Sequence, residues 1–168
     1  MKRALILVES GYEEFELWVP YYRLLEEGIA VACVGPKAGA LYAGKHGIEA
    51  RADVSFSEAD LKSAQAVIIP GGWAPDRLRT HPEAIALVKG AHERGIVIAA
   101  ICHAGSLLVS ADIVRGRRVT SYRSIRDDLR AAGAEWMDEP VVVDGNLITS
   151  RTPSDLPVFL PAILAAIQ

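Results

Sequence analysis

The sequence predicts an α/β protein built on a doubly wound, mainly parallel sheet with helices on both faces. Short apolar runs alternate with amphipathic stretches along the whole chain, which is the pattern of strands that alternate with helices. The run 96–101 is apolar at every position, as expected of a strand in the centre of a parallel sheet. Gly35-Pro36 and Pro70-Gly71-Gly72 follow apolar runs and end them.

The elements of the first half follow from periodicity and stop signals. Strands are expected at 4–8, 29–34 and 66–69, a hairpin or excursion over 40–54, and helices at 14–27 and 57–64. Gly28 is expected to end the first helix and Ser57 to cap the second. The apolar face of the first helix is predicted to consist of Leu17, Tyr21, Leu24 and Leu25.

The second half continues the alternation and ends on a helix. Helices are expected at 82–94, 104–110, 125–132 and 156–167, and strands at 96–101 and from 119 onward. Residues 141–149 predict a hairpin that turns at Asp144-Gly145-Asn146. No repeat, linker or low-complexity tract interrupts the chain, so residues 1–168 are predicted to form one domain.

Composition narrows the class of protein. With 51% hydrophobic and 23% charged residues, the chain resembles globular rather than disordered proteins. A net charge of −3, with no stretch rich in Lys and Arg, argues against a nucleic-acid or anionic-membrane partner. The apolar start stops at Glu9, and no apolar stretch is long enough to span a bilayer. Two cysteines are too few for a disulfide scaffold, so we expect a cytoplasmic protein with reduced thiols.

Three loops are candidates for a functional site. Ligand sites in doubly wound sheets lie beyond the carboxyl ends of the strands. Segments 11–14, 71–76 and 102–105 each follow a predicted strand. They are distant in sequence, but parallel strands can bring them to the same edge of the sheet.

Cys102 carries the strongest chemical signal. It directly follows the run 96–101 and stands between Ala100 and Ala104, and a nucleophile on a tight strand-to-helix turn needs small residues at these two positions. The N-terminus of the next helix would lower the pKa of the thiol. A plain core cysteine would not explain the polar His103 that follows. We therefore predict a reactive thiolate at Cys102 and an inert thiol at Cys33.

The other two loops each have a plain explanation beside the functional one. The acidic run with Glu13, Glu14 and Glu16 suits a solvated helix start, but one of its carboxyls could share a proton with the thiol. Gly71 and Gly72 either form a tight turn or aim backbone amides at a ligand, as an oxyanion hole requires. The remaining histidines are interpreted as structural: His46, His81 and His92. No metal or cofactor is expected, because no zinc spacing, dinucleotide fingerprint or phosphate loop occurs.

Together these segments resemble the DJ/PfpI superfamily and, within it, the PfpI-type intracellular proteases. The matching stretches span nearly the whole chain and include Tyr12-Glu13-Glu14-Phe15-Glu16-Leu17, Gly44-Lys45-His46-Gly47, Ile69-Pro70-Gly71-Gly72, Ala74-Pro75-Asp76, Ile101-Cys102-His103, Thr120-Ser121-Tyr122 and Ser150-Arg151-Thr152-Pro153. One departure concerns the first helical turn after the nucleophile, where members usually have Gly-Pro and this chain has Ala104-Gly105.

The resemblance implies a flavodoxin-like core, similar to that of class I glutamine amidotransferases. It implies Cys102 as nucleophile, Glu13 as its carboxyl partner, and His103 as acid and base. It also implies a homo-oligomer, dimeric or larger, in which Asp76 of a neighbouring subunit orients His103.

Further roles are implied for the pocket itself. The amides of Gly71 and Gly72, with that of His103, would hold a developing oxyanion, and Tyr122 would line the pocket. The partner is then a small carbonyl substrate or a peptide.

Three functions remain open from the sequence. The favoured one is a stress-protective enzyme for reactive carbonyls, of the glutathione-independent glyoxalase or protein deglycase type, because a small, tightly walled turn suits small carbonyls. The second is a PfpI-type cysteine peptidase that passes through an acyl-enzyme. The third is a redox sensor or chaperone, in which Cys102 becomes a sulfinate held by Glu13. A sensor needs no second proton-transfer group, so His103 favours an enzyme.

Overall fold

A seven-stranded, mainly parallel sheet forms the centre of the molecule. The computed structural model describes residues 2–168. The strand order is β10-β11-β7-β6-β1-β2-β5, and only the β10–β11 pair is antiparallel within this sheet of the described chain. The strands are β1 (Arg3–Leu7), β2 (Ala30–Gly35), β5 (Val54–Ser55), β6 (Ala64–Ile69), β7 (Val97–Ile101), β10 (Val141–Asp144) and β11 (Leu147–Ser150). The predicted doubly wound α/β fold is confirmed.

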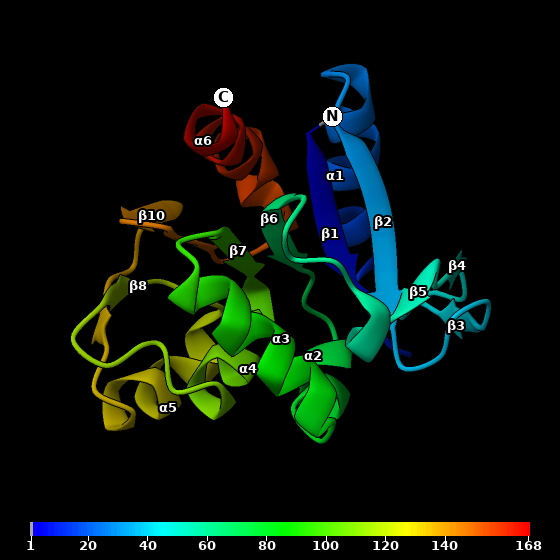
Figure 1. Cartoon of the computed structure of the whole chain (residues 1–168). Helices are drawn as coiled ribbons and strands as arrows, with labels where there is room; N and C mark the ends of the chain where they lie inside the picture. The colour runs from blue at the N-terminus through cyan, green and yellow to red at the C-terminus, as the bar shows by residue number, and fades with distance from the viewer. Residues whose placement is uncertain (1) are drawn as a thin grey trace.

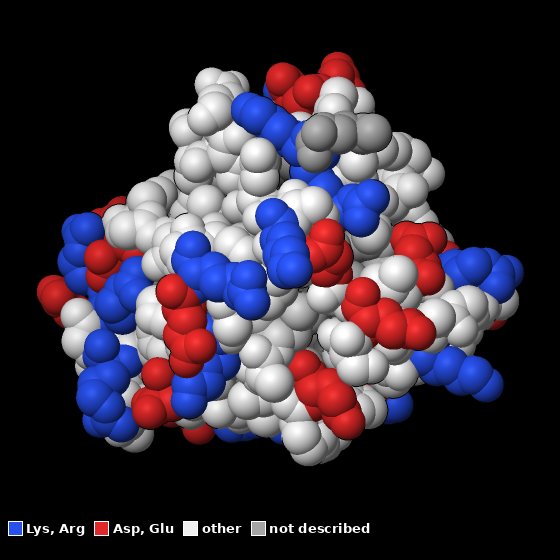
Figure 2. Space-filling view, viewed as in Figure 1, with Lys and Arg blue, Asp and Glu red and all other residues white. Residues whose placement is uncertain are grey.

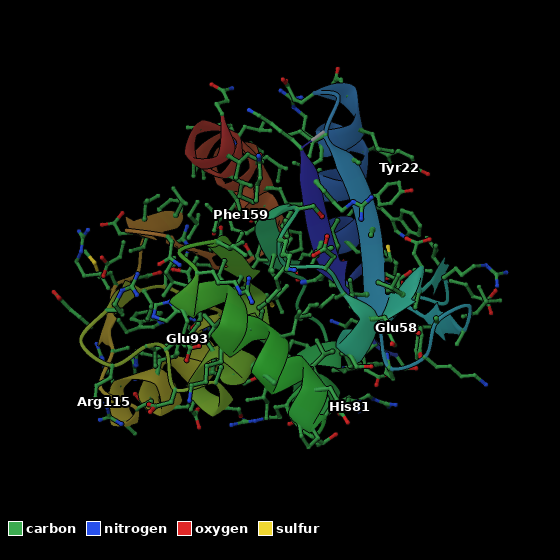
Figure 3. The ribbon with its side chains drawn as sticks, in the orientation of Figure 1. Tyr22, Glu58, His81, Glu93, Arg115 and Phe159 are labelled. Atoms are coloured by element: carbon green, nitrogen blue, oxygen red, sulfur yellow. The ribbon has the colours of Figure 1, made fainter. Side chains whose placement is uncertain are left out.

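Helices cover both faces of this sheet (Figure 1). On one side lie α1 (Glu14–Glu26) and α6 (Leu156–Ile167), and on the other α2 (Ala74–Leu78), α3 (Pro82–Glu93), α4 (Gly105–Ser110) and α5 (Arg126–Ala131). Alternate strand residues enter two separate cores, so Ile68 packs with Phe159 of α6 while Val67 packs with Leu107 of α4. Figure 3 labels Phe159 between α6 and the sheet. Within residues 2–168 no helix combines the length and apolarity needed to cross a membrane.

Two small sheets flank the main one. The predicted hairpin over 40–54 is confirmed as the antiparallel pair β3 (Leu41–Ala43) and β4 (Glu49–Arg51). A second, parallel pair joins β8 (Arg118–Val119) to β9 (Glu135–Trp136). The strand expected from 119 onward is thus present as β8 but ends at Val119, and β9 was not predicted, because two residues are too few to show alternation. Acidic and basic side chains are interspersed over the face shown in Figure 2.

Two local predictions are corrected. Instead of a helix over 57–64, a 3₁₀ turn η1 (Phe56–Glu58) is capped by Ser55, and β6 already begins at Ala64. The Asp60 carboxylate accepts hydrogen bonds from Lys62 N (2.8 Å) and Ser63 Oγ (2.9 Å), and such local bonds compete with a helix.

The buried face of α1 also differs from the prediction. Leu17 and Leu24 are buried as expected, but Leu25 is 43% exposed. The fully buried Glu16 lies on the inner face instead, and this acid leads directly to the site.

Candidate active site

Cys102 sits on a strained turn at the carboxyl end of β7. It opens the 3₁₀ turn η2 (Cys102–Ala104) with a φ of 62°, a left-handed conformation that costs a non-glycine residue about 1–3 kcal/mol. The N–H of Tyr122 donates to its carbonyl at 3.0 Å. Gly71, just after β6, makes room for it, because a Cβ there would lie 2.6 Å from Cys102 Cβ. The predicted strand-to-helix turn therefore presents the thiol at the sheet edge.

His103 contacts the sulfur directly. Its Nδ1 lies 3.3 Å from Cys102 Sγ, and its Nε2 lies 3.0 Å from Ser124 Oγ. The ring stacks on Tyr122 with a centroid distance of 4.9 Å and an interplanar angle of 29°. Burial, and then the charge of Lys45, lower the pKa of His103. The imidazole is therefore neutral at neutral pH and able to accept the thiol proton.

The carboxyl that lies beside the Cys102 side chain belongs to Glu16. Its side chain is fully buried, and its Oε1 accepts the Gly71 N–H at 2.8 Å. The position that a Cβ on Gly71 would take is 2.6 Å from Glu16 Oε1 and 2.6 Å from Cys102 Cβ, so the two side chains meet there. Burial raises the pKa of Glu16 to about 8. The hydrogen bond from Gly71 acts in the opposite direction, and the charge of Glu13 raises the pKa further. Glu16 is thus largely a neutral acid at pH 7.

Glu13, the carboxyl implied by resemblance, has a different place. Its Oε2 accepts the Glu16 N–H at 3.0 Å and caps α1, while the side chain lines the cavity in front of Cys102. The structure therefore brings both acids to the site, but Glu16 lies in the buried space beside the thiol, whereas Glu13 lines the cavity. A sequence signal existed, because Glu16 lies four residues before Pro20 and eight before Leu24, which places it on the face that carries these two residues.

The expectation of a low thiol pKa is corrected. Burial, and then the charge of Glu16, raise the pKa of Cys102 to about 12, although the nearby backbone amides of Gly72 and His103 oppose this. The helix that follows, α4, has only 6 residues, so its dipole does not outweigh burial. Burial raises the pKa of Cys33 to about 12 as well, so neighbours rather than pKa distinguish the two thiols.

The glycine amides divide between two tasks. Gly72 has a φ of 79°, and any Cβ there would lie 2.5 Å from the Gly11 carbonyl oxygen. The Gly72 and His103 amides face the sulfur, where an oxyanion on a bound carbon would form. The Gly71 amide is taken by Glu16, which corrects its expected role in an oxyanion hole.

A cavity of about 280 Å³ opens in front of the sulfur. It is lined by Glu13, Lys45, Gly72, Trp73, Cys102, His103, Tyr122, Thr152 and Pro153. A neighbouring cavity of about 460 Å³ shares Gly72, Trp73 and His103, and Asp76 of the same chain lines it. The sequence analysis did not predict Lys45 and Trp73 as site residues, although both lie in or beside motifs that match the family. It also did not predict Ser124, for which the sequence held no signal.

One group of side chains has metal-ligand character. Glu13, Glu14 and His46 bring their ligand atoms together. The Glu14 carboxylate already accepts the His46 N–H and lies 3.0 Å from His46 Nδ1, and Glu13 caps α1. These contacts explain the group as a structural link between α1 and the β3–β4 hairpin.

Comparison with known proteins decides the family. Residues 2–166 match the model of the DJ-1/PfpI family. The chain belongs to the DJ-1/PfpI family. The resemblance inferred from the motifs is thereby confirmed across the chain.

Members of this family carry enzyme names. A deglycase of Pyrococcus abyssi is 44% identical over 154 residues, which cover 92% of this chain and 92% of that protein. YraA of Bacillus subtilis, described as a candidate cysteine protease, is 38% identical over 158 residues, 94% of each chain. The two names point to an enzymatic family and leave the reaction of this DJ-1/PfpI chain undecided.

A solved structure supports the fold. A two-domain protein of Anabaena variabilis, with DJ-1/ThiJ/PfpI-like and ferritin-like domains, superposes with a TM-score of 0.96 at 40% identity. The match covers 98% of this chain and 48% of that protein, so this chain spans about half of that two-domain length.

Proposed function

We propose that this protein is a cysteine-nucleophile enzyme that converts reactive α-oxoaldehydes to hydroxy acids, a glyoxalase or deglycase type of activity. One observation carries the proposal. Cys102 Sγ lies 3.3 Å from the neutral His103 ring at the base of a cavity of about 280 Å³. That volume suits a carbonyl compound of a few heavy atoms better than a folded polypeptide.

The first step is addition of sulfur to the aldehyde carbon. His103 Nδ1 takes the thiol proton as the S–C bond forms, and the proton is returned to the new alkoxide to give a hemithioacetal. The Gly72 and His103 amides face this oxygen. Because burial keeps the thiol protonated, the base generates the nucleophile only when substrate is bound.

The second step is an internal rearrangement followed by hydrolysis. A proton leaves the former aldehyde carbon and the adjacent carbonyl oxygen is protonated, which gives an enediol. The hydroxyl on the former aldehyde carbon then loses its proton as the neighbouring carbon gains one, which yields a thioester. Water then cleaves the S–C bond and restores the thiol. In total, one α-oxoaldehyde and one water give one 2-hydroxy acid, and no external oxidant or reductant is needed. Glu16, neutral at pH 7, serves as a proton reservoir beside the sulfur.

A peptidase is the second candidate, and one observation favours it. The cavity of about 460 Å³ continues beyond His103 and shares Gly72 and Trp73 with the first. A peptide needs binding surface on both sides of the scissile bond, and the two cavities together offer it. In this case Cys102 attacks an amide carbonyl and His103 protonates the leaving amine.

The deciding experiment compares substrates and variants side by side. We expect purified protein to convert methylglyoxal to lactate without glutathione or metal, and chelator to leave the rate unchanged. Cys102→Ser should abolish turnover, and His103→Ala should lower it by about 10²–10⁴-fold, the usual contribution of a positioned acid–base group. Cleavage of a casein-derived peptide with methylglyoxal untouched would establish the peptidase. Inertness to both, with clean oxidation of Cys102 to a sulfinate by peroxide, would establish the sensor.

We also propose that the protein is a homo-oligomer in which Asp76 acts on a neighbouring subunit. Asp76 and His103 line the same second cavity. Helix α1 in addition exposes large apolar side chains, Phe15 by 64% and Tyr22 by 63%, and surfaces of this kind mark interfaces.

A further inference from the structure

Lys45 brings a positive charge to the mouth of the Cys102 cavity. It lines that cavity, and its Nζ lies 5.6 Å from the centroid of the Trp73 ring. Among residues 2–168 it forms no ion pair with a carboxylate. A cation without a carboxylate partner, beside a nucleophile, is free to pair with a bound anion.

The position of Lys45 is fixed by its backbone. Its N–H donates to the Tyr12 carbonyl at 2.8 Å, and the adjacent Gly11 N–H donates to Ala43 O at 2.8 Å. The buried Glu14 carboxylate holds the next residue, His46, by its N–H and its ring. The hairpin tip is thereby clamped to the loop that carries Glu13, and Lys45 extends from it along Trp73.

The charge of Lys45 reaches the reacting groups. It lowers the pKa of His103, after burial, and it opposes the burial that raises the pKa of Cys102 and of Glu16. A charge that is felt at the sulfur, the imidazole and the carboxyl is also felt by any anionic group on a molecule bound to that sulfur.

We infer that Lys45 is a specificity-determining residue that selects α-oxoaldehydes carrying an anionic group, a phosphate ester or a carboxylate, near the reacting aldehyde. The inference rests on the proposed function. The anionic group pairs with Lys45 and takes no part in bond making, so the reaction itself is the same as that proposed above. Glu13 lines the same cavity and opposes the anion, but its Oε2 accepts the Glu16 N–H at the start of α1, which partly compensates its charge.

Two alkylating reagents test the charge preference without any turnover. Iodoacetate and iodoacetamide react with the same thiolate and differ in charge, so the ratio of their rates at Cys102 cancels changes in thiol pKa. We expect Lys45→Met to lower the iodoacetate to iodoacetamide ratio about threefold to tenfold at low salt. Lys45→Arg should retain the ratio, Glu13→Gln should raise it, and Lys89→Met, on the remote helix α3, should leave it unchanged. Mass spectrometry of the Cys102 peptide gives each rate.

Turnover separates this inference from the proposed function. We expect wild-type protein to prefer an α-oxoaldehyde with a phosphate ester on its third carbon over methylglyoxal in kcat/KM, and Lys45→Met to lose that preference. An unchanged alkylation ratio in Lys45→Met overturns the role of Lys45, whatever the turnover. Wild-type protein inert to both aldehydes, with the ratio still dependent on Lys45, overturns the proposed reaction and supports anion selection at Cys102.

Discussion

The titration of Cys102 depends on Glu16, because the charge of this carboxyl acts on the thiol. The carboxyl has a pKa raised to about 8, and its negative charge is one cause of the raised thiol pKa. Below pH 8 Glu16 is mostly protonated and does not oppose ionisation of the thiol. Above pH 8 its charge does oppose it, so ionisation of the thiol depends on the protonation state of Glu16.

Glu16→Gln separates the pair. The amide keeps an oxygen for the Gly71 N–H but carries no charge, so the thiolate forms at lower pH than in wild-type protein. We expect the pH profile of Cys102 alkylation by iodoacetamide to shift down by about 1 unit, the usual effect of removing one nearby like charge. The rate measured at pH 9 should rise accordingly.

Glu13→Gln is the matched control, because it leaves the Glu16 carboxyl in place. A larger downward shift in Glu13→Gln than in Glu16→Gln would return the role of the thiol's partner to Glu13. An unchanged profile in Glu16→Gln would show that the two groups are not coupled.

The β3–β4 hairpin and helix α1 hold the site together at the scale of elements. Glu14 in the first turn of α1 accepts the His46 N–H and contacts His46 Nδ1 at the hairpin tip. Burial tends to raise the pKa of Glu14, but several hydrogen bonds, those from His46 foremost, outweigh it together and the pKa is lowered. This link is therefore present at neutral pH and is lost as the pH falls through the lowered pKa of the folded state.

Glu14→Ala should loosen the hairpin without removing a reacting group. We expect faster amide hydrogen exchange across residues 44–48 and a loss of global stability of about 1.5–3 kcal/mol, the usual contribution of hydrogen bonds to a charged group. Glu49→Ala, on the exposed start of β4, is the control and should change neither. Equal protection of residues 44–48 in Glu14→Ala and wild-type protein would mean that the hairpin is held by its backbone bonds alone.

The exposed apolar face of α1 concerns the assembly state of the whole molecule. Phe15, Val19, Tyr22 and Leu25 are between 40% and 64% exposed, and Figure 3 labels Tyr22 beside this helix at the edge of the molecule. We expect light scattering at micromolar concentration to show a dimer or larger assembly, and Phe15→Asp to weaken it. A monomer in wild-type protein would remove the oligomer from the proposal.

Subunit mixing tests whether Asp76 acts across an interface. Asp76→Ala and Cys102→Ser should each be nearly inactive alone, and co-expressed subunits should regain part of the wild-type turnover if the site is composite. If the mixed subunits assemble but regain no turnover, Asp76 does not act across the interface. Full activity of Asp76→Ala by itself would exclude a catalytic contribution, and Ser124, 3.0 Å from His103 Nε2, would remain as the partner of that nitrogen.

The sequence by itself determined the fold class and the place of the candidate nucleophile, Cys102, at the end of a strand. The spacing of apolar residues and their order along the chain are local properties of the sequence. The apolar run that forms β7 and the small residues around Cys102 could therefore be recognised without knowledge of tertiary contacts. The hairpin at 141–149 followed in the same way from its turn residues. The motifs that resemble the family were sufficient to name it, because many ordered matches coincide over the chain.

Tertiary structure alone decided which carboxyl lies behind the sulfur and which way the thiol titrates. The orientation of α1 against β1, β2 and α6 buries Glu16 at Gly71 and turns Glu13 to the cavity, and that orientation depends on tertiary packing. The pKa values of Cys102 and Glu16 are set mainly by burial, which exists only once both cores have formed. Ser124 meets His103 through a loop contact 21 residues away in sequence, a distance over which local pattern carries no information.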